Sequence, residues 1–199
     1  MSLDVAIIDS GGANLASLQF ALERLGARSV VTSDMAVISE APRVLLPGVG
    51  SALAAMQRLT TSGVAAQLPK LKQPVLGICL GMQLLYLKSE EGPAQCLGIL
   101  PQTVRKLEPT AGRPVPHMGW NRLRIGREDP LLDGIANGEY LYFVHSYAVP
   151  LSANTLASAE YGVDIAAVVR KDNFWGTQFH PERSTKVGAR ILANFLRLT

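Results

Sequence analysis

One of the two cysteines, Cys79, lies in a setting that suits a nucleophile. Gly77 and Gly81 flank it at two residues on either side, in the pattern G-x-C-x-G. This is the cysteine form of the nucleophile elbow, in which glycines let a strand turn sharply into a helix. The thiol then lies at a helix N-terminus, where unpaired N–H groups favour the reactive thiolate and the N–H of Leu80 can hold an oxyanion. We therefore predict a nucleophile at Cys79; the alternative is an ordinary buried cysteine.

A cysteine nucleophile needs a base, and three histidines are available. Glu182 follows His180 by two residues, so its carboxylate can orient the imidazole from the same loop. His117 and His145 have no adjacent carboxylate, and for each we expect an imidazole hydrogen-bonded to the backbone. The order Cys, His, Glu differs from the order Ser, Asp, His of the α/β-hydrolases, which argues against that fold. The expected catalytic groups are thus Cys79, His180 and Glu182.

A glycine-rich turn precedes Cys79 in the chain. Pro47-Gly48-Val49-Gly50 has neither the lysine of a phosphate-binding loop nor the G-x-G-x-x-G pattern of a dinucleotide site. It follows a predicted parallel strand, so its tip should lie at the same carboxyl edge of the sheet as Cys79, where open α/β sheets bind ligands. We expect its backbone to supply a second oxyanion donor.

The elements that must position these residues alternate between strand and helix in the first half of the chain. Leucines at helical spacing run from Asn14 to Leu25. Ser51 suits the N-cap of a second helix, which runs through Leu59. Apolar strands that alternate with helices indicate a parallel sheet covered on both faces. We expect strands at residues 5–8, 30–31, 44–46 and 74–78, and an apolar helix that opens over residues 80–87.

After Gly92 the pattern changes to short apolar runs separated by turn residues, which predicts antiparallel strands added to the sheet. No charge block or Pro/Gly/Ser-rich linker divides the 199 residues, so we expect one domain over 1–199. The predicted fold class is α/β: an open sheet with a parallel core, added antiparallel strands and helices on both faces. We expect the added strands at residues 103–107, 123–125, 140–144 and 165–169, and a last helix over 187–198.

The charge balance and the cysteines argue against several classes of protein. Lys and Arg number 19 against 16 Asp and Glu, and the net charge of +3 is too small and too scattered for a nucleic-acid surface. The N-terminus lacks a signal-peptide pattern, and no apolar run is long enough to span a bilayer. The cysteines show no metal-ligand spacing. We therefore expect a cytoplasmic protein without disulfides or a metal ion, in which Cys96 is an ordinary thiol.

Three segments, in the order in which they occur, resemble the signature of class I (triad) glutamine amidotransferase domains. They are residues 47–50, 77–83 and 178–182. Within this class, residues 117–121 and 142–147, and Asn14 after the first strand, resemble the family of glutaminase subunits of imidazole glycerol phosphate synthase, which serve histidine biosynthesis. One departure is Arg183, where the family pattern has a lysine of different geometry. The resemblance covers nearly the whole chain and implies a flavodoxin-like version of the predicted sheet.

The resemblance implies a reaction. Cys79 would attack the carboxamide of glutamine and form a thioester. His180 would give its proton to the departing ammonia and then activate water against the thioester, while Glu182 fixes the imidazole ring. The N–H groups of Val49 and Leu80 would hold the oxyanion. No cofactor is implied, and the residues implied to bind glutamine are Gly48, Gly50, Gln83, Ser146 and Tyr147.

The resemblance also implies a partner. The chain has no recognisable site for a nucleotide-like acceptor, so its ammonia would be used elsewhere. The implied partner is a cyclase subunit with a (β/α)8 barrel, which receives the ammonia within a heterodimer and makes imidazole glycerol phosphate and the aminoimidazole carboxamide ribotide. The residues implied to lie at this interface are Asn14, Met118, Trp120, Asn121, Tyr142 and Arg183.

Two alternatives remain open from the sequence. The first is the same chemistry in the service of another synthase, for pyridoxal phosphate, anthranilate or carbamoyl phosphate; the segment 117–121 argues against it. The second is a non-enzymatic binding module on a flavodoxin-like fold. Loss of the cysteine or of the His-Pro-Glu segment would mark such a module, and both are present here.

Overall fold

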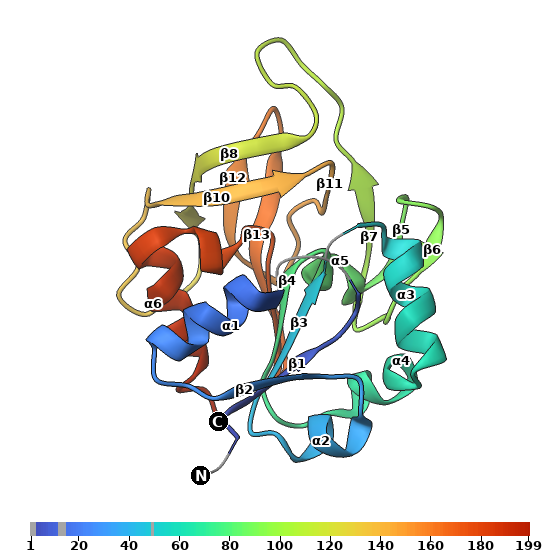
Figure 1. Ribbon diagram of the computed structural model, residues 1–199. Coiled ribbons are helices and arrows are strands. Elements are labelled where there is room, and N and C mark those ends of the chain that lie inside the picture. The colour runs from blue at the N-terminus through green and yellow to red at the C-terminus, as the bar shows by residue number, and fades with distance from the viewer. Residues whose placement is uncertain (1–2, 12–14, 49) are drawn as a thin grey trace.

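The computed structural model describes residues 3–11, 15–48 and 50–199, and in these residues the strands of the main sheet follow the order β2-β1-β3-β4-β14-β13-β12-β9 (Figure 1). Strands β2 to β14 in this order pair in parallel, and each later strand pairs antiparallel with its neighbour. The bounds are β1 Val5–Ile8, β2 Ser29–Thr32, β3 Val44–Gly48, β4 Val75–Cys79, β9 Arg124–Ile125, β12 Thr155–Glu160, β13 Asp164–Lys171 and β14 Phe174–Thr177.

Helices cover both faces of the parallel region. Val5 and Ile7 of β1 pack into a core shared with α1 (Leu15–Arg24) and α6 (Thr185–Phe195). Ala6 and Ile8 point to the other face and pack with α2 (Met35–Glu40) and α3 (Ala52–Thr61). Figure 1 shows these two pairs of helices on opposite sides of the sheet. Because both faces are buried, the strands carry apolar residues without alternation, as the sequence predicted.

The first half of the chain agrees with the predicted order of strands and helices. Strands β1, β2, β3 and β4 lie within about two residues of the predicted ranges. The side chain of Ser51 accepts a hydrogen bond from the Ala54 N–H and caps α3, as predicted. Two short helices were not predicted: α2, and α4 at Val64–Gln67. The described residues also form short 3₁₀ helices: η1 Leu68–Lys70, η2 Pro130–Leu132 and η3 Pro181–Arg183.

The prediction of one helix over residues 80–87 is wrong in its second half. Helix α5 covers only Leu80–Leu84, and strand β5 (Tyr86–Ser89) begins two residues later. Tyr86 is fully buried, pairs with Leu100 of β7 and accepts a hydrogen bond from the Gly98 N–H. An apolar run without polar alternation does not distinguish a buried strand from a helix, and here pairing with β7 determines the outcome.

The later strands do not all join the main sheet, which corrects the prediction. The predicted run 103–107 belongs to β7 (Leu100–Lys106), and the run 140–144 belongs to β10 (Tyr140–His145). Within the described part of the chain, β10 pairs with β8 (His117–Arg122) alone, in an antiparallel ribbon above the carboxyl edge of the sheet (Figure 1). The remaining strands, with β5 and β7, form a sheet in the order β11-β7-β5-β6, with β6 at Ala94–Gln95 and β11 at Tyr147–Ala148.

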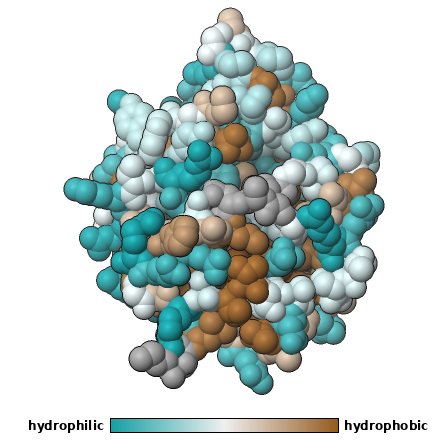
Figure 2. Space-filling model, viewed as in Figure 1, coloured by the Kyte–Doolittle hydropathy of each residue, from teal (hydrophilic) through white to brown (hydrophobic). Residues whose placement is uncertain are grey.

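The main sheet has an incompletely covered edge at β2, whose residues are all half-buried. On the face drawn in Figure 2, hydrophobic residues gather in a band at the lower centre, in the region of this strand, and hydrophilic residues cover much of the rest. Among the residues that the structure describes, no helix is long and apolar enough to cross a membrane.

Candidate active site

Cys79 lies at the junction of β4 and α5 with a backbone conformation that few side chains adopt. Its φ is 54° and its ψ is −110°. A Cβ atom added to Gly81 would overlap the Leu46 carbonyl, and one added to Gly77 would lie 2.6 Å from the Gly81 carbonyl oxygen. The two glycines therefore let the helix cross closely over β3 and β4. The local geometry of a nucleophile elbow, predicted from the sequence, is confirmed.

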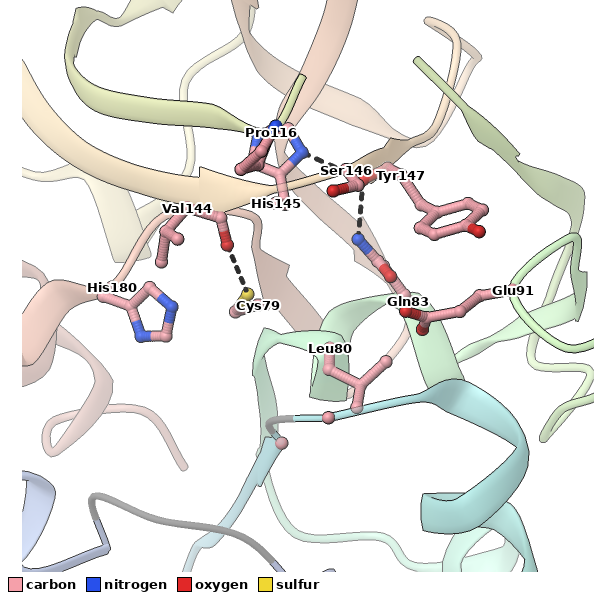
Figure 3. Close-up of a pocket in the computed structure, with 12 residues that line it drawn as sticks. Cys79, Leu80, Gln83, Glu91, Pro116, Val144, His145, Ser146, Tyr147 and His180 are labelled. Atoms are coloured by element: carbon pink, nitrogen blue, oxygen red, sulfur yellow. Dashed lines mark hydrogen bonds between the residues drawn. The ribbon is translucent and has the colours of Figure 1, made fainter. Parts of the chain in front are cut away.

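His180 and Glu182 follow β14, at the start of η3. The Nδ1 atom of His180 lies 2.8 Å from Oε1 of Glu182, and their side chains are 9% and 6% exposed. The His180 backbone N–H donates to the carbonyl of Tyr142 on β10, which holds this turn against the ribbon. In Figure 3 the His180 imidazole points toward the Cys79 thiol. Residues about 100 positions apart thus meet at the carboxyl edge of the sheet, as predicted.

The electrostatics of His180 favour its protonated form. Burial lowers the pKa of His180, but hydrogen bonding with Cys79 and Glu182 and the charges of both groups outweigh burial and raise the pKa from 6.5 to about 10. His180 is therefore an imidazolium at neutral pH. In this state it can stabilise a neighbouring thiolate and give a proton to a leaving group.

The thiol opens into a cavity of about 360 Å³, a volume within the range of small-molecule sites. Sγ of Cys79 lies 3.7 Å from the carbonyl oxygen of Val144 and 3.9 Å from Nε2 of Gln178. The cavity wall also includes Leu80 and each residue expected to bind glutamine: Gly48, Gly50, Gln83, Ser146 and Tyr147. The second expected oxyanion donor, Val49, lies outside the described residues, so its place in the site stays a prediction.

The other two histidines form a buried pair at the cavity, whose wall includes His145 but not His117. His145 places Nδ1 2.9 Å from the Tyr147 carbonyl oxygen, so the expected bond to the backbone is confirmed for this residue. For His117 that expectation is wrong, because its Nδ1 lies 3.0 Å from Nε2 of His145 and its Nε2 lies 3.3 Å from the Asn121 amide nitrogen. Burial lowers the pKa of His117 to about 4, and burial together with His117 lowers that of His145 to about 3. Both are neutral imidazoles at pH 7.

Glu91 is a residue of the cavity wall that the sequence analysis did not identify. Its Oε2 accepts a hydrogen bond of 2.8 Å from the Ala52 N–H. Burial raises its pKa, and the hydrogen bond from Ala52 opposes this rise. Glu91 follows β5 in a turn without any motif, and only the packing of that turn against the start of α3 places the carboxylate here. No local pattern could have indicated it.

The residues expected at a partner interface lie partly on the outer face of the β8–β10 ribbon. Met118 and Trp120 are 66% and 50% exposed and alternate along β8, so both are available to a partner on one face of the ribbon. Tyr142 lies between Trp120, at 5.9 Å between ring centroids, and the Arg183 guanidinium, at 4.7 Å from its ring centroid. Asn121 turns inward and bonds to the Glu160 carbonyl. Asn14 lies outside the described residues.

Cys96, the second cysteine, differs from Cys79 in its surroundings. Its thiol contacts the Ala94 carbonyl, and burial, together with the charge of Glu91, raises its pKa to about 11. Such a thiol stays protonated at neutral pH, which agrees with the expectation of an ordinary cysteine. Among the described residues no group of three or more His, Cys, Asp or Glu side chains could hold a metal ion.

Comparisons with known proteins agree with this site. Residues 6–198 match the model of the family "Glutamine amidotransferase class-I". Relatives include the imidazole glycerol phosphate synthase subunit HisH of Xanthomonas oryzae pv. oryzae, 52% identical over 98% of both chains, and that of Shewanella oneidensis, 51% identical over 98% of this chain and 96% of the other.

Solved structures with the same fold are more distant in sequence. A putative GMP synthase protein of Thermoplasma acidophilum matches with a TM-score of 0.73 and 20% identity, over 98% of this chain and 93% of that one. PurLQS of Thermotoga maritima matches with a TM-score of 0.73 and 20% identity over 98% of each chain. At this identity the two structures establish the fold alone.

Proposed function

The chain belongs to the class I glutamine amidotransferases and, within them, to the HisH family of imidazole glycerol phosphate synthase subunits, and from this premise we propose that it hydrolyses glutamine at Cys79 and passes the ammonia to a cyclase partner. The observation that carries the proposal is the strained elbow cysteine that shares one cavity with a buried, protonated His180. A binding module would have no need of a nucleophile in this setting.

The first half of the reaction forms a thioester. The thiolate of Cys79 attacks the carboxamide carbon of glutamine, and the carbonyl oxygen becomes an oxyanion that the Leu80 N–H stabilises, together with that of Val49. Helix α5 has only five residues, so these N–H groups act at short range rather than through a long helix dipole. His180 gives its proton to the nitrogen of the leaving group, the C–N bond breaks, and ammonia departs.

The second half releases glutamate. His180, now neutral, takes a proton from water, whose oxygen attacks the thioester carbon. The C–S bond breaks, glutamate leaves, and the thiolate of Cys79 and the imidazolium of His180 are restored. Glu182 contributes by holding Nδ1 of His180, so that Nε2 faces the reacting atoms in both halves. The balance is glutamine and water to glutamate and ammonia.

The cavity offers complementary groups for the backbone end of glutamine. The Glu91 carboxylate suits the α-ammonium group, and the backbones of Gly50, Ser146 and Tyr147 suit the α-carboxylate and the carboxamide. We assign Gln83 to the substrate as well, because its nitrogen makes both of its hydrogen bonds within the protein while its side-chain oxygen has no partner among the described residues. A charged ligand for the ammonium explains how so small a cavity would distinguish an amino acid from a simple amide.

The proposed acceptor site belongs to a partner, a cyclase of (β/α)8 fold in a heterodimer within the cytoplasm. Support comes from relatives that are named as synthase subunits and from the exposed side chains of Met118 and Trp120 beside the His180 turn. The two free cysteines agree with a reducing compartment.

The test is a glutamine hydrolysis assay on the full chain, alone and with candidate cyclase partners, and with Cys79→Ala in parallel. We expect glutamate release from the wild-type chain in complex and none from the variant. With ammonia in place of glutamine, the complex of the variant should still form the cyclase product, because the two sites are separate. A variant complex that is inactive with ammonia would contradict the division of labour between the two chains.

A further inference from the structure

The carbonyl oxygen of Tyr147 accepts hydrogen bonds from two sides. Nδ1 of His145 lies 2.9 Å from it, and Nε2 of Gln83 lies 2.8 Å from it. Figure 3 shows both contacts meeting at this residue on the wall of the cavity. A backbone carbonyl oxygen can only accept, so both partners must present an N–H group. One atom therefore fixes the direction of the hydrogen bonds on either side.

The first arm leads away from the cavity through two imidazoles. His145 donates from Nδ1, and as a neutral ring it must then accept at Nε2. His117, 3.0 Å away, must supply that proton from its own Nδ1. Its Nε2 is then an acceptor, and it faces the amide nitrogen of Asn121, which also donates to the Glu160 carbonyl. The arm is therefore directed from Asn121 through His117 and His145 to Tyr147, with each ring in its Nδ1–H form.

The second arm leads to the nucleophile. Gln83 donates one N–H to Tyr147 and the other to Oε1 of Gln178, at 3.0 Å. Because Gln178 accepts with its oxygen, its Nε2 must point the other way, and that atom lies 3.9 Å from Sγ of Cys79. Gln83 and Gln178 are 3% and 0% exposed, so water cannot easily replace these partners.

We propose that His117 and His145 are positioning residues for the glutaminase, which hold the Tyr147 carbonyl and through it set the amide orientations of Gln83 and Gln178. In that orientation Gln83 presents its oxygen to the substrate and Gln178 presents an N–H to the sulfur of Cys79. This inference rests on the proposed function, since it assigns the two histidines a role in glutamine binding that acts through the Tyr147 carbonyl. His145 lies in the cavity wall. His117 is not part of the cavity wall and acts only through His145.

A packing role is the alternative. His117 stacks between Phe143, at 4.8 Å between ring centroids, and Tyr161, at 3.9 Å. If stacking were the only contribution of His117, two substitutions that weaken the stack to the same extent would weaken the binding of a glutamine analogue to the same extent. Phe143→Leu provides that comparison, because it removes an aromatic contact with His117 but no hydrogen bond of the chain.

The first test is spectroscopic and needs no substrate. Long-range ¹H–¹⁵N correlation spectra of the full chain at pH 7, assigned with His117→Asn and His145→Gln, report which ring nitrogens carry protons. We expect His117 and His145 each to be protonated at Nδ1 alone, and His180 at both nitrogens. The Nε2–H form at either His117 or His145 would overturn the hydrogen-bond chain.

The second test separates positioning from packing. A glutamine-like diazoketone alkylates the nucleophile, and mass spectrometry follows the labelling of Cys79. The labelling rate as a function of reagent concentration gives a half-saturating concentration and a maximal inactivation rate. His117→Gln places its amide near the Nε2 position and loses the donor to His145, whereas His117→Asn keeps a donor near the Nδ1 position. We expect His117→Gln to raise the half-saturating concentration about five- to tenfold, and His117→Asn to restore most of the loss.

Two results would overturn the positioning role. One is a half-saturating concentration of the diazoketone in His117→Gln that equals the wild-type value. The other is an equal rise of that concentration in Phe143→Leu and His117→Gln when the two variants have the same melting temperature. Failure of the proposed function has a different signature: the wild-type chain, with and without a cyclase, would neither hydrolyse glutamine nor react with the diazoketone at Cys79.

Discussion

The molecule contains two side-chain pairs built on histidine, His180–Glu182 and His117–His145, and the histidine pKa values in the two pairs shift in opposite directions. His180 faces the carboxylate of Glu182 and the sulfur of Cys79, and its pKa rises to about 10. His145 faces a carbonyl and a second imidazole, and its pKa falls to about 3. Both rings are buried. The comparison shows that burial alone does not decide the protonation of a histidine; the hydrogen bonds that its partners make and the charge that they carry do.

The largest expected difference between the pairs is in catalysis. Cys79→Ala and His180→Ala should each lower the glutaminase kcat by about 10⁴-fold or more, because members of a catalytic unit fail together. His117→Asn should leave kcat within a few-fold of the wild type. Steady-state assays on the complex measure both. The matched control for the nucleophile is Cys96→Ala. The Cys96 thiol is protonated at neutral pH and lies outside the cavity wall, so kcat of this variant should equal that of the wild type.

If His117→Asn abolished glutaminase activity while His180→Ala remained active, the catalytic role would belong to His117 and His145 instead of His180 and Glu182. Alkylation of Cys96 rather than Cys79 by the diazoketone would likewise contradict the choice of nucleophile.

The two pairs should also act on stability at opposite ends of the pH range. Below pH 6.5 the unfolded chain binds protons at His117 and His145, while the folded chain, with pKa values of about 4 and about 3, does not. The free energy of unfolding should therefore fall as the pH falls toward 4, by about 1.4 kcal/mol per pH unit for each ring. His180 behaves in the opposite way: its contribution is complete below pH 6.5 and is lost as the pH rises toward 10.

Urea unfolding of the wild type and of His117→Asn at pH 4.5, 5.5 and 6.5 measures this effect. The variant lacks one of the two buried neutral rings. Its free energy of unfolding should therefore fall less steeply with decreasing pH, by the contribution of one histidine. Identical slopes in the two proteins would show that His117 is not buried as a neutral ring.

The pairs differ as well in what the sequence reveals about them. His180 and Glu182 are two residues apart, and the elbow glycines lie within two residues of Cys79, so short patterns contain most of the triad. His117 and His145 are 28 residues apart and meet only because β8 and β10 pair with these two residues opposite each other. That register depends on β8, for which no strand was predicted, and on β10, which was predicted to extend the main sheet.

The position of Glu91 and the end of α5 were also missed from the sequence. The carboxylate reaches the cavity through a hydrogen bond to Ala52, 39 residues earlier, and α5 stops at Leu84 because Tyr86 pairs with β7. Both features depend on contacts between distant segments. The parallel core could be predicted because its strands and helices follow from local apolar patterns.

Loss of the Glu182 charge should lower kcat moderately, by less than loss of Cys79 or of the His180 ring. Glu182→Gln keeps the size of the side chain and removes its charge, so kcat should fall by about ten- to a hundredfold, less than with loss of the ring. The charge of Glu182 helps to raise the pKa of His180 to about 10 in the free chain, so the alkaline limb of kcat/KM should move to lower pH in the variant. The pH profile of kcat/KM, measured from pH 7 to pH 10.5, tests this. A lower kcat with an unshifted limb would mean that Glu182 orients His180 without affecting its charge.

The smallest expected effect concerns the strain at Cys79 itself, which the histidine pairs do not share. With φ at 54° and ψ at −110°, a side chain at this position is strained, whereas glycine is not. Cys79→Gly should therefore be more stable than Cys79→Ala by about 1 kcal/mol, although glycine normally costs stability through the unfolded chain. At Cys96, which has no positive φ, the order should reverse, so Cys96→Gly and Cys96→Ala are the matched control in the same urea titrations. If alanine were the more stable residue at both positions, the elbow would store no strain, and the reactivity of Cys79 would depend on His180 and its carboxylate alone.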